Sequence, residues 1–298
     1  MQNRGCTGAI PDRAGGPHSA GRDSVRLEQA IKKLKSFQDG DRGLLETVAC
    51  GTQAIAALRA LLFEREPSGL FQARCRAVEA LAALAAYDVL AEFLRAPREA
   101  ADPVERIGDD VVANAAARAL GKLREPAAFE LLMWLAETNP LPGVIAALGS
   151  SVRAEAIPYF VEALAEDESR LAAEAALRDF GPRAHQALAV AACRSSPPLE
   201  DESESRLRQR RSALELLAET GVRPELWPAL RNLMHEKDQK KDQKLAVLAC
   251  KIGLLSAPEA KKRDVILRLL SLLPGADFPL EQEINHRLVS YLGREAEQ

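Results

Sequence analysis

The sequence predicts an all-α protein, a right-handed α-α superhelix made of about eight stacked helix pairs. Composition is the first observation behind this prediction. Ala and Leu far outnumber Val and Ile, and aromatic residues make up only 4% of the 298 residues, a bias that favours helices over strands. The second observation is internal repetition, because similar segments recur every 28 to 40 residues. A period of this length is typical of a helical solenoid.

The repeats are recognised by a run of small and apolar residues that ends in glycine. Val111–Leu123 and Leu171–Gly181 are two such runs. Glycine favours the end of a helix because it adopts positive φ without a steric penalty. We expect helix ends at seven glycines, with Ala82 standing where one further landmark is missing: Gly51, Gly121, Gly149, Gly181, Gly221, Gly253 and Gly293.

Each repeat contains two helices, and the segment from Ala154 shows this most clearly. Its apolar residues recur at i, i+3, i+4 and i+7, which places them on one buried stripe of a first helix. Asp167 stands where an N-cap belongs, Glu168–Phe180 forms the second helix, and Gly181 ends it. Similar first-helix stripes are Ile157, Phe160, Val161 and Leu164; Ile55, Leu58 and Leu62; Phe129, Leu132, Met133 and Ala136; and Val265, Leu269 and Leu272.

The repeats account for nearly the whole chain. Residues 1–23 are rich in Gly and Pro and lack an apolar stretch, so we predict a disordered tail and no secretory signal. Residues 24–298 are predicted to form the solenoid. Two polar stretches, 96–108 and 195–205, are predicted as long loops.

The pattern AIPYFVEAL followed by DESRLAAEAALRDFG resembles HEAT repeats, and it is closest to the short, Ala-rich bacterial kind called phycobilisome-lyase-type HEAT-like repeats. DDVVANAAARALGKL (109–123) is similar to the second helix of that repeat. The resemblance implies that the second helices line a concave layer on which a partner protein binds. It also offers one alternative function, an accessory or regulatory subunit of an enzyme similar to the bilin-lyase proteins. Deoxyhypusine hydroxylases are HEAT-repeat enzymes with four His-Glu dipeptides, and this chain has only His235-Glu236.

The sequence carries no motif for catalysis, a cofactor or a metal. It has no HExxH, phosphate-binding glycine loop, GxSxG or CxxC. The acidic pairs Asp109/Asp110 and Asp167/Glu168 are expected at helix starts, where they favour the helix dipole. The five cysteines are widely spaced, which favours buried thiols in a reducing, cytoplasmic protein. We therefore predict no enzyme activity, no catalytic residue, no cofactor and no metal site. No apolar run is long enough for a membrane span.

Charge is unevenly distributed although the net charge is only −3. Residues 64–203 carry 14 basic and 23 acidic residues, whereas residues 204–263 carry 14 basic and 8 acidic residues. The basic group opens the second helices of the sixth and seventh units, so it is a candidate patch for an acidic partner, with solvated helix faces as the alternative. The candidate residues are Arg206, Arg208, Arg210, Arg211, Lys240, Lys241 and Lys244.

The two tryptophans are predicted to lie in different places. Trp227 aligns with Ile157 on the buried stripe, and Trp134 aligns with Glu162, off that stripe. Trp134 is therefore a candidate anchor for a partner, with packing against a neighbouring loop as the alternative.

These features predict a non-enzymatic protein-interaction scaffold that binds another protein on its concave surface. The enzyme-subunit function named above is one alternative. A second is nucleic-acid binding through the C-terminal basic patch, which the scarcity of aromatic residues beside these charges disfavours.

Overall fold

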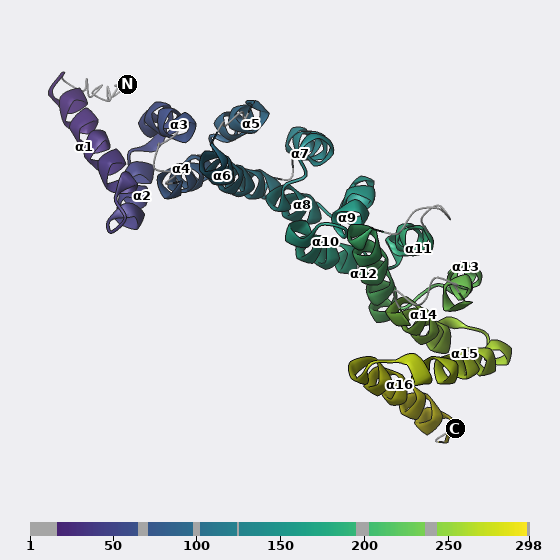
Figure 1. Cartoon of the computed structure of the whole chain (residues 1–298). Coiled ribbons are helices and arrows are strands. Elements are labelled where there is room, and N and C mark those ends of the chain that lie inside the picture. The colour runs from purple at the N-terminus through teal and green to yellow at the C-terminus, as the bar shows by residue number, and fades with distance from the viewer. Residues whose placement is uncertain are drawn as a thin grey trace, which may run out of the picture. The chain divides into compact units, whose positions relative to one another are not determined.

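The computed structural model describes residues 17–64, 71–97, 102–123, 125–194, 203–235 and 243–296. These residues form sixteen α-helices joined by short 3₁₀ turns, and they contain no strand. The all-α class and the expected eight helix pairs are therefore confirmed (Figure 1). None of the helices described has the length and apolar character that crossing a membrane requires. The chain divides into two compact units, Met1–Ala115 (unit 1) and Ala116–Gln298 (unit 2).

Unit 1 contains five complete helices and the first part of a sixth. Helix α1 packs against α2 and α4, and α3 packs against α4 and α5. Leucines at helical spacing fill the space between them, and Leu34, Leu58 and Leu81 are completely buried. The helices are α1 (Pro17–Lys35), α2 (Gly40–Ala49), α3 (Ile55–Phe63), α4 (Gln72–Ala83), α5 (Tyr87–Arg95) and α6 (Pro103–Gly121).

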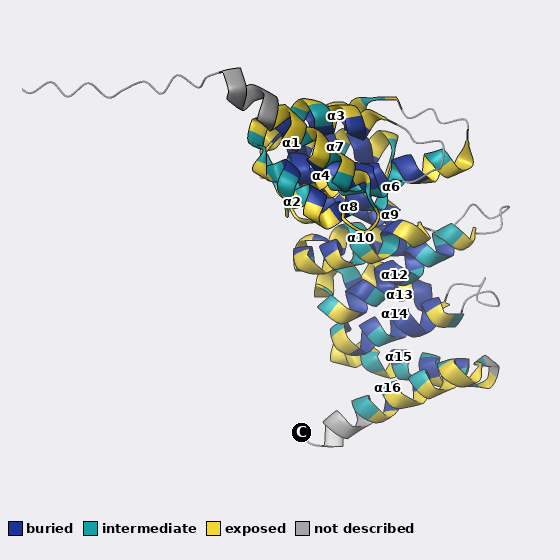
Figure 2. Ribbon diagram, turned by 90° about the vertical axis from the view of Figure 1, so that its left-hand side faces the viewer, coloured by how far each residue is buried: buried dark blue, intermediate teal, exposed yellow. Residues whose placement is uncertain are grey.

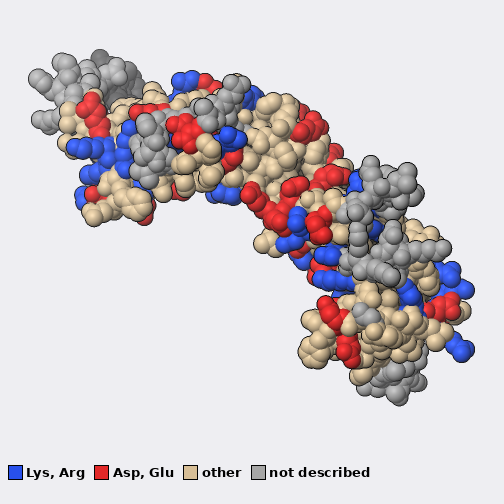
Figure 3. Space-filling model, in the orientation of Figure 1, with Lys and Arg blue, Asp and Glu red and all other residues tan. Residues whose placement is uncertain are grey.

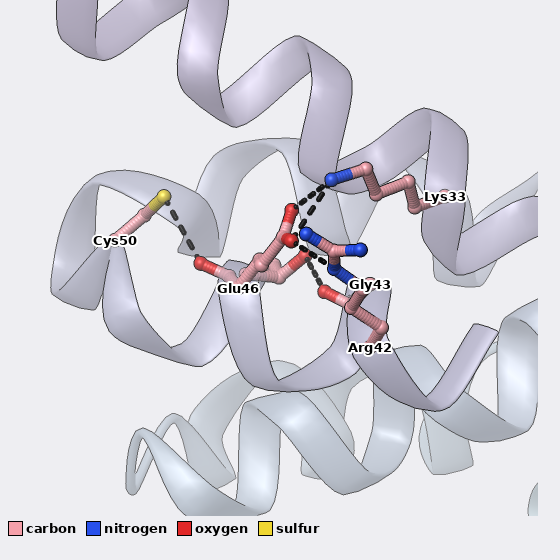
Figure 4. Close-up of polar contacts among 6 residues, drawn as sticks. Lys33, Arg42, Gly43, Glu46 and Cys50 are labelled. Carbon is pink, nitrogen blue, oxygen red and sulfur yellow. Dashed lines mark hydrogen bonds and ion pairs between the residues drawn. The ribbon is translucent and has the colours of Figure 1, made fainter. Parts of the chain in front are cut away.

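The first helix begins earlier than the sequence indicated. Helix α1 starts at Pro17, seven residues before the predicted boundary of the tail, and residues 1–16 lie outside the described part of the chain. Polar contacts join α1 to α2 (Figure 4). Glu46 accepts hydrogen bonds from Lys33 Nζ at 2.7 Å and from Arg42 Nε at 2.8 Å. These two cations hold the pKa of the Glu46 carboxyl below its usual value.

Unit 2 stacks helix pairs in a regular order. The second helices pack in sequence, with α8 on α10, α10 on α12, α12 on α14 and α14 on α16, and among the first helices α11 packs on α9 and α13. Buried residues line the helices where these layers meet (Figure 2). The helices are α7 (Pro126–Thr138), α8 (Pro142–Gly149), α9 (Ile157–Ala163), α10 (Asp167–Phe180), α11 (His185–Cys193), α12 (Glu204–Thr220), α13 (Trp227–Arg231), α14 (Gln243–Ser256), α15 (Glu259–Leu272) and α16 (Phe278–Ala296).

The apolar stripes predicted for the first helices form the core. Phe160 and Leu164 are completely buried in the pair α9/α10, as are Val265 and Leu269 on α15. Phe160 also lies against Phe180 of α10, with ring centroids 5.8 Å apart. Only Met133 and Ile55 of the predicted stripes are partly exposed. Helical periodicity therefore identified the buried face correctly.

The landmark glycines serve two different purposes. Gly181 and Gly221 end α10 and α12 with φ of 52° and 80°, as expected. Gly121 and Gly149 are the last residues of their helices, and each lies close to an alanine of the next second helix, Ala147 and Ala176 respectively. A β-carbon at Gly121 would lie 2.7 Å from Ala147.

Two further glycines were wrongly expected at helix ends. Gly253 lies inside α14, where a β-carbon would come within 2.5 Å of the Trp227 ring. Gly293 lies inside α16. A glycine that permits close packing and a glycine that ends a helix look the same in sequence. Only the tertiary contact separates them.

A third correction concerns residues 96–108 and the acidic pair after them. Helix α6 begins at Pro103, so part of the predicted loop is helical and Asp109 lies well inside the helix. Asp109 is buried, and its Oδ1 pairs with Arg74 Nη1 at 2.6 Å. The other pair, Asp167 and Glu168, does open α10 as expected, although Asp167 is the first helical residue and Glu166, not Asp167, is the N-cap.

Candidate interaction surface

The exposed sides of α10, α12 and α14 form the surface of unit 2 that we call the second-helix face. Its residues recur at helical spacing on each helix, opposite the buried side. They are Glu168, Leu171 and Arg178 on α10, Arg211, Glu215 and Glu219 on α12, and Lys244, Lys251 and Leu255 on α14.

Ion pairs connect neighbouring helices across this face. Arg178 Nε of α10 lies 2.8 Å from Glu219 Oε2 of α12, and Lys244 Nζ of α14 lies 2.8 Å from Glu215 Oε1. The hydrogen bond that Arg178 donates to Glu219 raises the pKa of Arg178 above its ordinary value. Exposed pairs of this kind contribute little to stability. Their effect is to hold charged side chains at defined positions, and acidic and basic side chains are interspersed over α10 and α12 (Figure 3).

Two leucines interrupt the charges of the second-helix face. The residue exposure is 72% for Leu171 on α10 and 52% for Leu255 on α14. Leu255 lies one turn after Lys251. Lys251 and Lys244 are the only charged residues between Gln243 and Ser256 of α14. The face thus combines exposed apolar residues with charges of both signs.

Those of the predicted basic residues that the structure describes do not form one patch. Arg210 is 2% exposed, and its Nε donates to the carbonyl oxygen of Ala192 at 2.9 Å, so it lies inside the fold. Arg208 is partly buried and binds both the Ala165 carbonyl and the Asp167 carboxylate. Arg206 and Arg211 are partly exposed. Lys244 is paired with Glu215, and Lys240 and Lys241 lie outside the described residues.

Arg210 belongs to an arrangement that the sequence analysis missed. Near the start of α4, Arg74 Nε donates to the Leu62 carbonyl of α3 at 2.9 Å, just as Arg210 Nε of α12 does to Ala192 of α11. Each acceptor is the penultimate residue of the preceding helix. Carbonyls at a helix C-terminus lack partners within the helix, and a cation there also favours the helix dipole. The shared signal in sequence is Arg-x-Arg near the start of a second helix.

The other arginine of each Arg-x-Arg, which is the second in α4 and the first in α12, reaches one helix pair further back. Arg76 of α4 donates to the carbonyl oxygens of Leu34 and Ser36 at the end of α1, and Arg208 of α12 donates to that of Ala165 just after α9. These arginines therefore join successive pairs within each unit. Their guanidinium groups bind backbone carbonyl oxygens of the same protein.

The tryptophans lie where helical periodicity placed them. Trp227 is 3% exposed and packs in the core of unit 2, whereas Trp134 is 45% exposed on α7. Near Trp134, the hydroxyl of Tyr159 on α9 donates to Glu137 of α7. A role for Trp134 in partner binding stays a prediction.

Two buried titratable side chains in unit 2 belong to the core. Thr220 donates its hydroxyl hydrogen to the Leu216 carbonyl, so His185 Nε2, 3.1 Å away, is the donor to Thr220 Oγ1. Burial, together with the charge of Arg223, lowers the pKa of His185. Burial raises the pKa of the Cys250 thiol to about 12. No group of three or more potential metal ligands occurs within the described ranges.

The fold and this surface define an all-α protein of repeated helix pairs whose second helices present a face of mixed charge. No family model and no curated protein matches the sequence. Among solved structures, the chain is similar to the complex of CpcE and CpcF of phycocyanin lyase from Nostoc sp. PCC7120, with 21% identity, a TM-score of 0.37 and coverage of 90% of this chain and 100% of that chain. It is also similar to human deoxyhypusine hydroxylase in complex with glycerol, with 15% identity, a TM-score of 0.35 and coverage of 93% and 100%. Neither likeness is close enough to show what this chain does.

Proposed function

We propose that this chain is a non-enzymatic, HEAT-like interaction scaffold that binds another protein on the second-helix face of unit 2. The observation that supports the proposal is the combination found on that face, where the exposed Leu171 and Leu255 lie among charged side chains held by neighbouring helices. A surface already ordered before binding loses little conformational entropy when a partner arrives. Apolar contacts would supply affinity, and the fixed charges would supply orientation.

The charges favour a partner that is acidic where it meets α14. Lys244 and Lys251 are the only charged residues of this helix. Lys244 shares its charge with Glu215 of α12. An acidic side chain of the partner would therefore meet α14 beside Leu255, and complementary charge of this kind mainly sets the association rate and the orientation.

The test compares two double variants in affinity capture from the native host, with captured proteins quantified by mass spectrometry. Leu171→Asp with Leu255→Asp alters the second-helix face. Leu267→Asp with Leu270→Asp is the matched control, because these leucines are 56% and 46% exposed on α15, a first helix. Circular dichroism first establishes that both variants keep the helicity of the parent.

The expected result is a protein that the parent and the control capture and that the face variant captures about tenfold less, equivalent to about 1.4 kcal/mol of binding free energy. Equal capture by the face variant and the parent contradicts the proposal. Equal loss in both variants also contradicts it, because binding would then depend on surface leucines in general.

A further inference from the structure

Helix α7 carries a second surface that the proposed function does not use. Trp134 is 45% exposed there, although an apolar ring of this size is normally placed in the core of a helical protein. Glu130 lies one turn before it and Glu137 one turn after it, and both are exposed. Residues four before and three after share one side of a helix. Trp134 therefore lies between two glutamates on one side of α7.

The same layer continues onto α9. The Tyr159 hydroxyl donates to Glu137, which holds that carboxylate beside a second aromatic ring and raises the pKa of the tyrosine. Helices α7 and α9 contain three glutamates and no lysine or arginine. We call Glu130, Trp134, Glu137 and Tyr159 the α7 surface.

Two basic side chains that the structure describes near α7 and α9, Arg153 and Arg194, are already paired. Arg153 lies 3.9 Å from the centroid of the Phe129 ring and pairs with Glu155 at 3.2 Å. Arg194 pairs with Glu162 at 3.4 Å, on the part of α9 beyond Tyr159. No ion pair with Glu130 or Glu137 is found among the residues that the structure describes.

We propose that the α7 surface binds an arginine-bearing segment of a partner protein. A guanidinium stacks on an indole through the negative face of the ring, and tryptophan is the best aromatic partner for a cation. Its planar donors at the same time reach carboxylates on either side of the ring. The α7 surface supplies both the indole and the carboxylates, because Glu130 and Glu137 each lie one helical turn from Trp134. An acidic segment would be repelled by the two carboxylates. An apolar segment would remove water from them without supplying a hydrogen-bond partner.

This surface differs from the second-helix face in position and in charge. It belongs to a first helix, and it selects a basic segment where α14 selects an acidic one. The inference therefore stands independently of the proposed function. Loss of binding at Leu171 and Leu255 would leave it unaffected.

The experiment measures the fluorescence anisotropy of a fluorescein-labelled tetra-arginine peptide titrated with the full chain. Tetra-citrulline, which keeps the planar group without its charge, is the peptide control. The protein variants are Trp134→Ala, the double variant Glu130→Gln with Glu137→Gln, and the matched double variant Glu28→Gln with Glu79→Gln. The last pair removes the same charge from exposed positions in unit 1.

We expect saturable binding of tetra-arginine that weakens at least about tenfold in Trp134→Ala and in the double variant at residues 130 and 137. We expect affinity within about twofold of the parent for the matched pair, and no saturable binding of tetra-citrulline. Equal weakening in both double variants would mean general attraction to an acidic chain and would overturn the proposal. So would unchanged affinity in Trp134→Ala, tight binding of tetra-citrulline, or no binding of tetra-arginine by the parent.

Discussion

Two residues other than glycine adopt positive φ shortly after second helices. Ala85 follows α4 with φ of 56°, and Val152 follows α8 with φ of 52°. Gly181, directly after α10, also has positive φ, at 52°. A β-branched residue in this region is strained, at a cost of about 1–3 kcal/mol. The Val152 side chain recovers little through packing because the residue is 45% exposed.

Val152→Gly should therefore stabilise the protein. We expect the free energy of unfolding from urea denaturation to rise by about 1 kcal/mol, because relief of strain exceeds the greater entropy of glycine in the unfolded chain. Val190→Gly is the control, since Val190 is 50% exposed within α11 and glycine should lower stability there by about 1 kcal/mol. A loss of stability in both variants would refute strain at position 152.

At the scale of the helices, buried arginines join elements that are distant in sequence. Arg210 of α12 reaches the end of α11, 18 residues earlier, across the stretch 195–202 that the structure does not describe. Arg74 of α4 makes the equivalent contact with α3, 12 residues earlier, and also pairs with Asp109 of α6. A buried guanidinium is tolerated in both places because carbonyl or carboxylate oxygens accept its hydrogens.

Arg210→Met should destabilise unit 2. Methionine fills much of the space but leaves the Ala192 carbonyl without its donor, which costs about 1–3 kcal/mol. Arg211→Met is the matched control at the next residue, because partly exposed charges contribute within about 1 kcal/mol. Urea denaturation followed by circular dichroism measures both changes. Equal losses of unfolding free energy in the two variants would show that the buried Arg210 contributes no more to stability than the partly exposed Arg211.

At the scale of the whole molecule, each unit has its own buried core. Cys250 lies in the core of unit 2, completely buried, and its thiol pKa is raised to about 12. The thiolate is the reactive form of cysteine. Reaction of Cys250 with an alkylating reagent therefore requires unit 2 to open.

Labelling with N-ethylmaleimide followed by peptide mass spectrometry should distinguish Cys250 from Cys193, which is partly exposed on α11. Under native conditions at neutral pH we expect Cys193 to react at least about a hundredfold faster. In urea the rate at Cys250 should rise along with the fraction of unfolded protein. Comparable native rates at the two thiols would contradict a closed core in unit 2.

The sequence by itself determined the helix pairs, their apolar stripes and the separation of the tryptophans into core and surface. These follow from helical periodicity, because a residue three or four positions from a buried neighbour shares its face. It also identified the glycines at 181 and 221 as helix ends, since the freedom to adopt positive φ without strain is a property of glycine itself.

Only the tertiary structure decided which arginines are buried and which charges remain on the surface. Charge composition predicted a basic patch at Arg206–Lys244, but Arg210 turns inward because a carbonyl of α11 lies within its reach. Likewise, Gly253 is explained by the Trp227 ring against it and Asp109 by Arg74. Each of these depends on a partner from another helix. Periodicity reports which side of a helix is buried, whereas long-range packing determines what that side meets.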